Sequence, residues 1–142
     1  MTRFLYRFCC GGLFGAQLFF AAVAAQIVFP SDVSALPRDH PRRQLAADLV
    51  GKMLARLDAA TIVGTAVAVI CALALGRRRE AIAPLLAGLC AVASAMLVTP
   101  AIHGMRAAGE VGSGRFGMLH GISSGLHVLE MILLAVALWR AS

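Results

Sequence analysis

The sequence predicts an all-α integral membrane protein, built as an up-down four-helix bundle that occupies residues 1–142 as a single domain. Three observations support this prediction. The chain is 60% hydrophobic and only 14% charged, whereas soluble domains are about half apolar and a quarter charged. It contains four apolar runs, each long enough for a spanning helix of ~20 residues. The runs are joined by mostly short connections, which are typical of antiparallel neighbours in a bundle.

The first apolar run covers residues 8–29 and is closed by Pro30. Arg3 and Arg7 precede it, as basic residues precede the hydrophobic part of a signal peptide. The run is too long for such a peptide, however, and lacks a clear small-residue cleavage site before polar sequence. We therefore expect a retained transmembrane helix. The polar segment SDVSALPRDHPRRQ follows, and its prolines predict a loop.

The second span is predicted over residues 50–75, but the helical pattern already begins near Gln44. Apolar and charged residues both recur there every four positions: Leu45, Leu49, Met53 and Leu57 on one stripe, and Asp48, Lys52 and Arg56 on another. No breaker separates this pattern from the apolar run. We therefore expect a helix that is longer than the bilayer is thick.

The third span is predicted over residues 81–103. Pro100 should kink this helix rather than end it, because AIHGMRAA can continue the helical pattern. The glycine-rich segment GEVGSG then predicts a turn before the fourth span, which covers residues 116–139.

The basic residues give a net charge of +6 and lie at the ends of the apolar runs. This is the pattern of anchors at anionic lipid headgroups, and it argues against a nucleic-acid partner. The end that holds both termini has six Lys and Arg residues and the opposite end has seven. We favour cytoplasmic termini in a bacterial inner membrane, because three arginines crowd the tight turn after the second span.

The fourth span carries polar residues that a lipid-facing helix would avoid. At 100° per residue, Phe116, His120, Ser123, His127 and Glu130 share one face. With Ser124, the last four form the predicted intramembrane polar site. A carboxylate near the centre of a span costs about 2.5–3.5 kcal/mol on insertion scales, so Glu130 should pair with His127 or with a basic residue of another helix. The face is an interhelical clamp, a functional site or a near-interface snorkelling arrangement with no role.

Two other faces of the same span complete the prediction. Gly117, Gly121 and Gly125 form a ridge that lets a neighbouring helix approach closely, either within the bundle or in a homo-oligomer. A third face is expected to meet lipid and consists of Leu119, Ile122, Leu126, Leu129 and Leu133. His103 and Arg106, after the third span, should lie at the mouth of the polar site.

The segments VTPAIHGMRAA and FGMLHGISSGLHVLE resemble the end of the transmembrane-protein-205-like family. That family is a four-helix membrane fold with no established biochemical activity. Its last span opens with an aromatic residue and His-Gly-x-Ser-Ser, here Phe116, His120, Gly121, Ser123 and Ser124. Members of the family carry Asn where this chain has His127. The resemblance therefore makes His120 the residue on which a family-wide function would depend.

Two function classes follow. In the first, the protein has no catalytic activity and no cofactor, and its polar stripe serves small-solute, ion or proton transport or an accessory role. In the second, His103, His120 and His127 bind haem or copper, a hypothesis that also rests on a distant likeness to copper-resistance and haem-binding four-helix membrane proteins. No nucleotide-binding, hydrolase or C-x-x-C motif is present.

Overall fold

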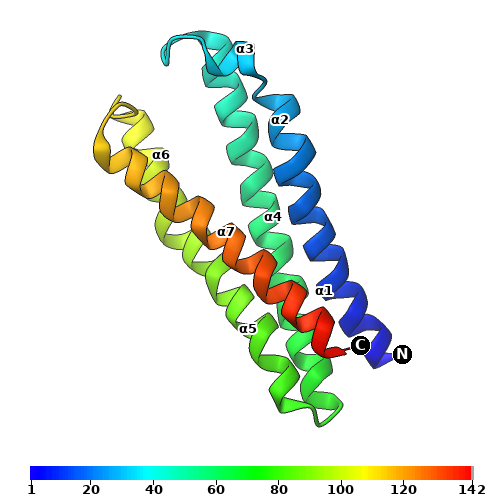
Figure 1. Cartoon of the computed structure of the whole chain (residues 1–142). Helices are drawn as coiled ribbons and strands as arrows, with labels where there is room; N and C mark the ends of the chain where they lie inside the picture. Colours follow the sequence, from blue (N-terminus) through cyan, green and yellow to red (C-terminus); the bar gives the residue numbers. More distant parts are fainter. Residues whose placement is uncertain (142) are drawn as a thin grey trace.

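Four helical rods make up the computed structural model, which describes residues 1–141 (Figure 1). The first rod comprises α1 (Thr2–Phe19), a π-helical turn η1 (Phe20–Ala24) and α2 (Ala25–Val28); a short helix α3 (Ser31–Ser34) follows. The second rod is α4 (Pro41–Ala74). The third comprises α5 (Arg78–Ala93), a second π-helical turn η2 (Ser94–Val98) and α6 (Thr99–Ala107). The fourth is α7 (Gly114–Ala141).

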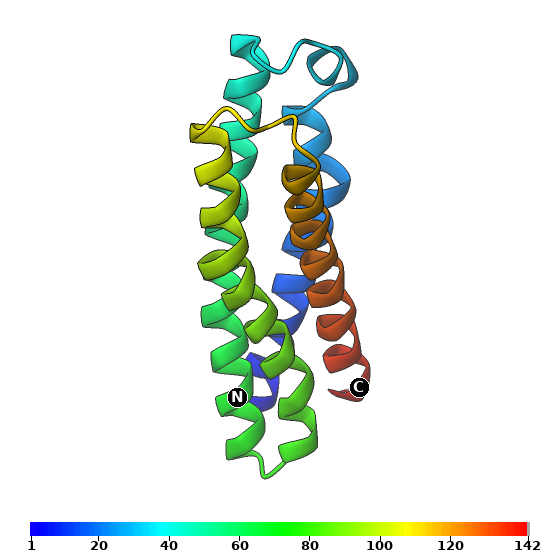
Figure 2. The ribbon, with the colours of Figure 1, turned by 90° about the vertical axis from the view of Figure 1, so that its left-hand side faces the viewer.

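The rods alternate in direction and form a ring in which α1 contacts α4, α4 contacts α5, α5 contacts α7 and α7 contacts α1. Both termini and the α4–α5 turn lie at one end, here called the terminal end (Figures 1 and 2). The loop around α3 and the α6–α7 turn lie at the other end, here called the open end. All four rods are long and apolar enough to cross a membrane. The predicted all-α, multi-pass membrane bundle is thus confirmed.

The structure has the predicted number of long helices, and each of them is longer than the span predicted for it. The first rod begins at Thr2 rather than at residue 8, because its helix continues through the basic residues that precede the apolar run. The second begins at Pro41, which needs no N–H donor in a first helical turn. The expectation that this helix exceeds the bilayer thickness is confirmed, since its 34 residues extend ~51 Å. The predicted loop also contains α3, which was not expected.

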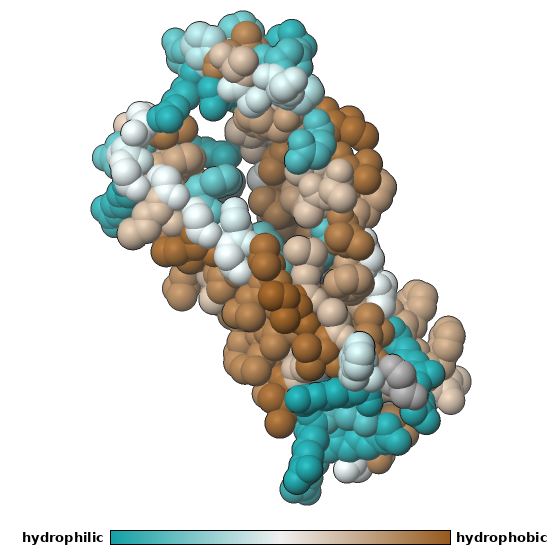
Figure 3. Space-filling view, in the orientation of Figure 1, coloured by the Kyte–Doolittle hydropathy of each residue, from teal (hydrophilic) through white to brown (hydrophobic). Residues whose placement is uncertain are grey.

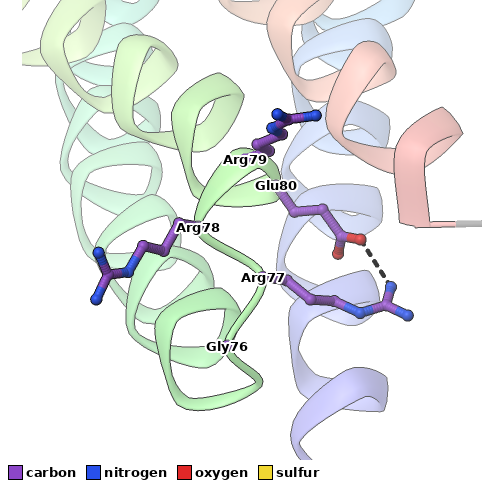
Figure 4. Close-up of a pocket in the computed structure, with 5 residues that line it drawn as sticks. All are labelled: Gly76, Arg77, Arg78, Arg79 and Glu80. Atoms are coloured by element: carbon purple, nitrogen blue, oxygen red, sulfur yellow. Dashed lines mark hydrogen bonds and ion pairs between the residues drawn. The ribbon is translucent and has the colours of Figure 1, made fainter.

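A glycine ends helix α4. At the end of α4, Gly76 has φ +72°; its N–H bonds Leu73 O and the next N–H, of Arg77, bonds Ala72 O. This Schellman motif satisfies carbonyls that a helix end leaves unpaired. The turn between α4 and α5 is therefore short, and Arg77, Arg78 and Arg79 lie close together at it. Figure 4 shows Arg77 paired with Glu80 at 2.7 Å, while the other two arginines point away from that pair.

Two prolines lie inside the third rod, and each is accommodated differently. Pro84 has no N–H to offer Glu80 O, four residues earlier. The buried Tyr6 hydroxyl donates to that carbonyl instead, at 3.0 Å. Pro100 follows directly on the wider turn η2, in which the N–H of Thr99 bonds Ser94 O. Such π-turns absorb a residue that does not fit the regular helix. The prediction that Pro100 does not end the helix is confirmed.

The terminal half of the bundle has a continuous core of small side chains, a group here called the terminal core. It consists of Tyr6, Cys10, Ala68, Cys71, Ala72, Ala81, Ala83, Ala87, Leu134, Ala137 and Ala141. Alanine and glycine at helix contacts are typical of membrane proteins, because they let backbones approach closely. A Cβ on Gly64 would lie 2.8 Å from Leu13, and one on Gly88 would lie 2.5 Å from the Thr65 hydroxyl.

The predicted glycine ridge does not pack against another helix of this chain. A Cβ added to Gly117, Gly121 or Gly125 would meet nothing within 4 Å, and all three residues are exposed. The expectation of close packing within the bundle is therefore wrong. The glycines that mediate close approach are Gly64 and Gly88. Contact with a second copy of the chain through the ridge stays a prediction.

At the open end the rods diverge, and the space-filling surface is hollowed between α6–α7 and α4, with hydrophilic side chains along the border (Figures 1 and 3). Side chains bridge the opening. Arg106 donates to Ala47 O of α4 at 3.3 Å, and Arg38 of the α3–α4 loop donates to Val111 O at 2.9 Å. The two halves of the bundle therefore differ: one is filled by the terminal core and the other is open.

The close contact at Gly88 predicts that Gly88→Val destabilises the bundle by about 1–3 kcal/mol, because the added atoms would force α4 and α5 apart. Gly15→Val, at an exposed position of α1 where an added Cβ meets nothing within 4 Å, serves as the matched control and should leave the thermal midpoint in detergent unchanged. Equal midpoints for the two variants would contradict the assignment of these glycines.

The Tyr6 hydrogen bond predicts that Tyr6→Phe lowers stability by about 0.5–2 kcal/mol, because Glu80 O loses its donor in an apolar core. Pro84→Ala restores a backbone N–H for that carbonyl. In a double-mutant cycle followed by thermal melts, Tyr6→Phe should cost markedly less in the Pro84→Ala background. Strict additivity would show that the hydroxyl does not compensate for the proline.

Candidate functional site

Each of the four rods contributes a buried polar side chain from near its middle. Gln17 comes from α1, Asp58 from α4, Ser94 from the first position of η2, and Glu130 from α7. None of these four side chains is more than 3% exposed. His127, one turn before Glu130 on α7, is 16% exposed. These five residues, here called the central cluster, form one polar layer between the terminal core and the open end.

Hydrogen bonds connect part of the central cluster. The Gln17 amide donates to Glu130 Oε2 at 2.7 Å and to the Thr61 hydroxyl at 3.2 Å. The Ser94 hydroxyl donates to Asp58 Oδ2 at 3.1 Å. Each carboxylate therefore has one oxygen that accepts a hydrogen bond from a neutral donor on another helix.

His127 stands between the two carboxylates. Its Nδ1 lies 3.8 Å from Asp58 Oδ1 and 3.7 Å from Glu130 Oε2. These distances are too long for hydrogen bonds. Nδ1 and Nε2 of His127, Oδ1 of Asp58, Oε1 of Glu130 and Oε1 of Gln17 are all buried without a hydrogen-bond partner. Since buried polar atoms in native proteins are nearly always paired, five such atoms in one layer point to a group that the chain itself does not supply.

No lysine or arginine pairs with the two buried carboxylates within residues 1–141. The ion pairs among these residues involve Asp32 with Arg42, Glu80 with Arg77, and His127 with Asp58 and Glu130. Lys52 and Arg56, considered as partners for Glu130, are exposed on α4. The central cluster is thus rich in acceptors and poor in positive charge.

The structure brings three of the five predicted polar-site residues to the interior. Glu130 and His127 belong to the central cluster, and Ser123 is buried on the same face of α7. His120 and Ser124 are exposed, so their expected place inside the site is wrong. His120 stacks on Phe116, with ring centroids 6.4 Å apart, and Ser124 donates to His120 O.

The leucine face of α7 is only partly directed to lipid. Ile122 and Leu129 are exposed, as expected, but Leu133 packs against the terminal core and Leu119 and Leu126 are half-buried. The exposed glycine ridge instead faces outward beside Ile122 and Leu129. The buried face of α7 consists of Ser123, Glu130, Leu134, Ala137 and Ala141.

His103 and Arg106 lie at the open end, as predicted for the mouth. Both side chains reach towards α4, where a Cβ on Gly51 would lie 3.8 Å from His103 Nε2 and from Arg106 Nη1. His103 is exposed and Arg106 is half-buried. The two residues therefore border the opening above the central cluster.

Gln17, Asp58, Thr61 and Ser94 were not predicted as site residues. A weak signal was present for each. Gln17 is the first strongly polar side chain within the run 8–29, and Ser94 is the only one within 81–98. Asp58, Thr61, Thr65, Ala68 and Ala72 recur every three or four residues, so they lie on one face of α4. The polar residues of the apolar runs, taken together, would have indicated the layer.

The arrangement can hold a metal ion. Within residues 1–141, Asp58, His127 and Glu130 are the group of His, Cys, Asp or Glu residues whose ligand atoms all lie within 4.8 Å of one another. His103 and His120 do not belong to it. Ligation of haem or copper by His103, His120 and His127 stays untested, but the partners gathered around His127 are carboxylates. Two shallow surface hollows lie at the terminal end and contain no residue of the central cluster.

These features define the chain as a multi-pass all-α membrane protein with a buried, ionisable site in its bundle. Comparisons with family models, with curated proteins and with solved structures found no match. The resemblance to the transmembrane-protein-205-like family therefore stays an expectation from the sequence.

The Gln17–Glu130 contact predicts that Gln17→Leu destabilises the bundle by about 1–3 kcal/mol, because a buried carboxylate oxygen loses its donor. The double variant Gln17→Leu/Glu130→Leu should be more stable than Gln17→Leu alone, since both polar partners are then absent. Gln26→Leu, at an exposed position of the same rod, is the control and should melt like the wild type. A double variant less stable than Gln17→Leu would argue against this hydrogen bond as the cause.

Proposed function

We propose that this protein is a transport protein of the bacterial inner membrane that binds a cation in the central cluster and carries it across the bilayer. One observation carries the proposal. Two carboxylates and an imidazole lie buried in the middle of a membrane bundle, with unpartnered ligand atoms and without a lysine or arginine among them. Ionisable residues within spanning helices are costly, and they commonly mark ion pathways.

The difference between the two halves of the bundle supports transport rather than permanent storage. At the open end the surface is hollowed between α6–α7 and α4 (Figure 3), and His127 of the central cluster is 16% exposed. Towards the terminal end, the terminal core fills the space between the helices. A site open to one side and closed to the other corresponds to one state of an alternating-access cycle. The cycle requires the terminal core to open while the opposite end closes.

The π-turns provide places where such a movement can occur. Ser94 begins η2, and Gln17 lies in the turn before η1, so two residues of the central cluster stand beside irregular helix. Pro100 follows η2 and weakens the same rod again. In this proposal α6 and α2 swing relative to α5 and α1, and the swing changes access to the site.

Membrane orientation follows from the positive charges at the ends. Lys52 and Arg56 are not at the end of α4. They lie ~17 and ~23 Å along the helix from its first residue, at 1.5 Å per residue. Without them the terminal end has more Lys and Arg than the open end. Positive residues of short loops prefer the cytoplasmic side. The proposal therefore places the terminal end in the cytoplasm and the open end outside.

The test is cation uptake by the purified protein in proteoliposomes, with separate fluorescent reporters for Na⁺, K⁺, Mn²⁺ and Zn²⁺. The wild type should take up at least one of these ions. Asp58→Asn and Glu130→Gln should each lower the initial rate at least tenfold, because both remove a negative ligand at nearly constant shape. Glu110→Gln, at an exposed turn, should retain the rate. Absence of uptake for all four ions, or full rates in both site variants, would refute the transport function.

A further inference from the structure

We infer that the central cluster is a binding site for a divalent first-row transition metal ion, with Asp58, His127 and Glu130 as ligands. This inference deepens the proposed function and rests on it for the role of the ion, but the binding site itself can be tested without transport. Three features of the cluster carry it: its charge, its ligand types and the spacing of its ligand atoms.

The charge of the cluster matches a doubly charged ion. Two carboxylates with no lysine or arginine partner leave two negative charges in the interior when both are ionised. Charges in such surroundings are stable only when they are paired or coordinate a metal. A divalent ion balances both carboxylates at once, whereas a monovalent ion leaves one of them uncompensated.

The ligand types select among divalent ions. Ca²⁺ and Mg²⁺ take oxygen ligands almost exclusively, and here an imidazole stands between the two carboxylates. Imidazole suits zinc, copper, iron and nickel, and soft thiolate and thioether ligands select Cu(I). No cysteine belongs to the group, and Met118 is exposed. A mixed set of carboxylates and imidazole therefore favours Mn²⁺, Fe²⁺, Co²⁺ or Zn²⁺ over copper(I) and over the alkaline earths.

The spacing of the atoms is close to that of a ligand shell. Ligand atoms bound to one such ion at about 2.0–2.2 Å lie ~3–4 Å from one another. In the structure His127 Nδ1 lies 3.8 Å from Asp58 Oδ1 and 3.7 Å from Glu130 Oε2. Small side-chain rotations are enough to bring the three atoms to one centre. All three residues also have buried atoms that lack partners.

Neighbouring side chains support the ligands. Ser94 donates to the second oxygen of Asp58, and Gln17 donates to Glu130. Such hydrogen bonds orient metal-binding carboxylates. Gln17 also has a buried amide oxygen without a partner.

The test is metal binding by the intact protein in mild detergent after removal of metal with EDTA. Co²⁺ serves as the optical probe and Zn²⁺ as the competitor. Binding is measured by absorption spectroscopy and by isothermal titration calorimetry. The wild type should bind one Co²⁺ per chain with d–d absorption, Zn²⁺ should displace it, and bound Zn²⁺ should raise the thermal midpoint. Asp58→Asn, His127→Ala and Glu130→Gln should each weaken binding at least tenfold. His120→Ala, an exposed histidine of the same helix, should bind like the wild type.

Other results overturn the inference. Absence of stoichiometric Co²⁺ and Zn²⁺ binding by the folded wild type refutes it without reference to any variant. So does binding that disappears in His120→Ala but persists in Glu130→Gln, because the metal would then lie on the surface. The two proposals fail separately: Na⁺ or K⁺ uptake without metal binding leaves transport intact and removes the transition-metal site. Binding without uptake of any ion keeps the site and removes transport.

Discussion

The structure depends on one constraint, which is that two carboxylates are buried halfway along a membrane bundle. Each would cost several kcal/mol if its helix faced lipid alone. Asp58 and Glu130 therefore have to meet polar groups of other helices at the same height. Gln17 and Ser94 supply those groups from the two remaining rods. This layer sets the register in which all four rods stand side by side, since a shift of one turn in any rod would leave a carboxylate without its donor.

The helices pack differently on the two sides of this layer, because the residues towards the terminal end differ from those towards the open end. Towards the terminal end, alanine and glycine allow the backbones to come close, and there is little side-chain volume to hold them apart. Towards the open end, α6 carries His103 and Arg106, whose polar groups need space and water. The π-turns lie between the two regimes in both rods that have them. A closed half and an open half thus follow from the order of small and polar residues along each helix.

Much of this fold could be predicted from the sequence, since four apolar runs in a chain of this length leave few arrangements. Glu130 and His127 could be predicted because they stand out within a hydrophobic helix. Gln17 and Ser94 carry only a weak signal, since a single polar residue in an apolar run has no periodicity that shows which way it faces. The glycine ridge was misjudged for a related reason. Small residues allow close packing but do not require it, and Gly121 turns outward because Ser123 and Glu130 turn inward.

The balance of donors and acceptors in the central cluster bears on the choice between the proposed binding site and a structural clamp. A clamp is stable when every buried donor meets an acceptor, and amides and hydroxyls can achieve this without buried charge. The central cluster instead combines two carboxylates with few donors: the Gln17 amide, the Ser94 hydroxyl and the His127 ring. Oxygens of Asp58 and Glu130 remain unpartnered although each carboxylate already has one hydrogen bond. Adding protein donors would have satisfied them, whereas a positively charged ion satisfies both at once. The excess of acceptors is therefore the feature of the central cluster that supports the proposed cation site over a structural clamp.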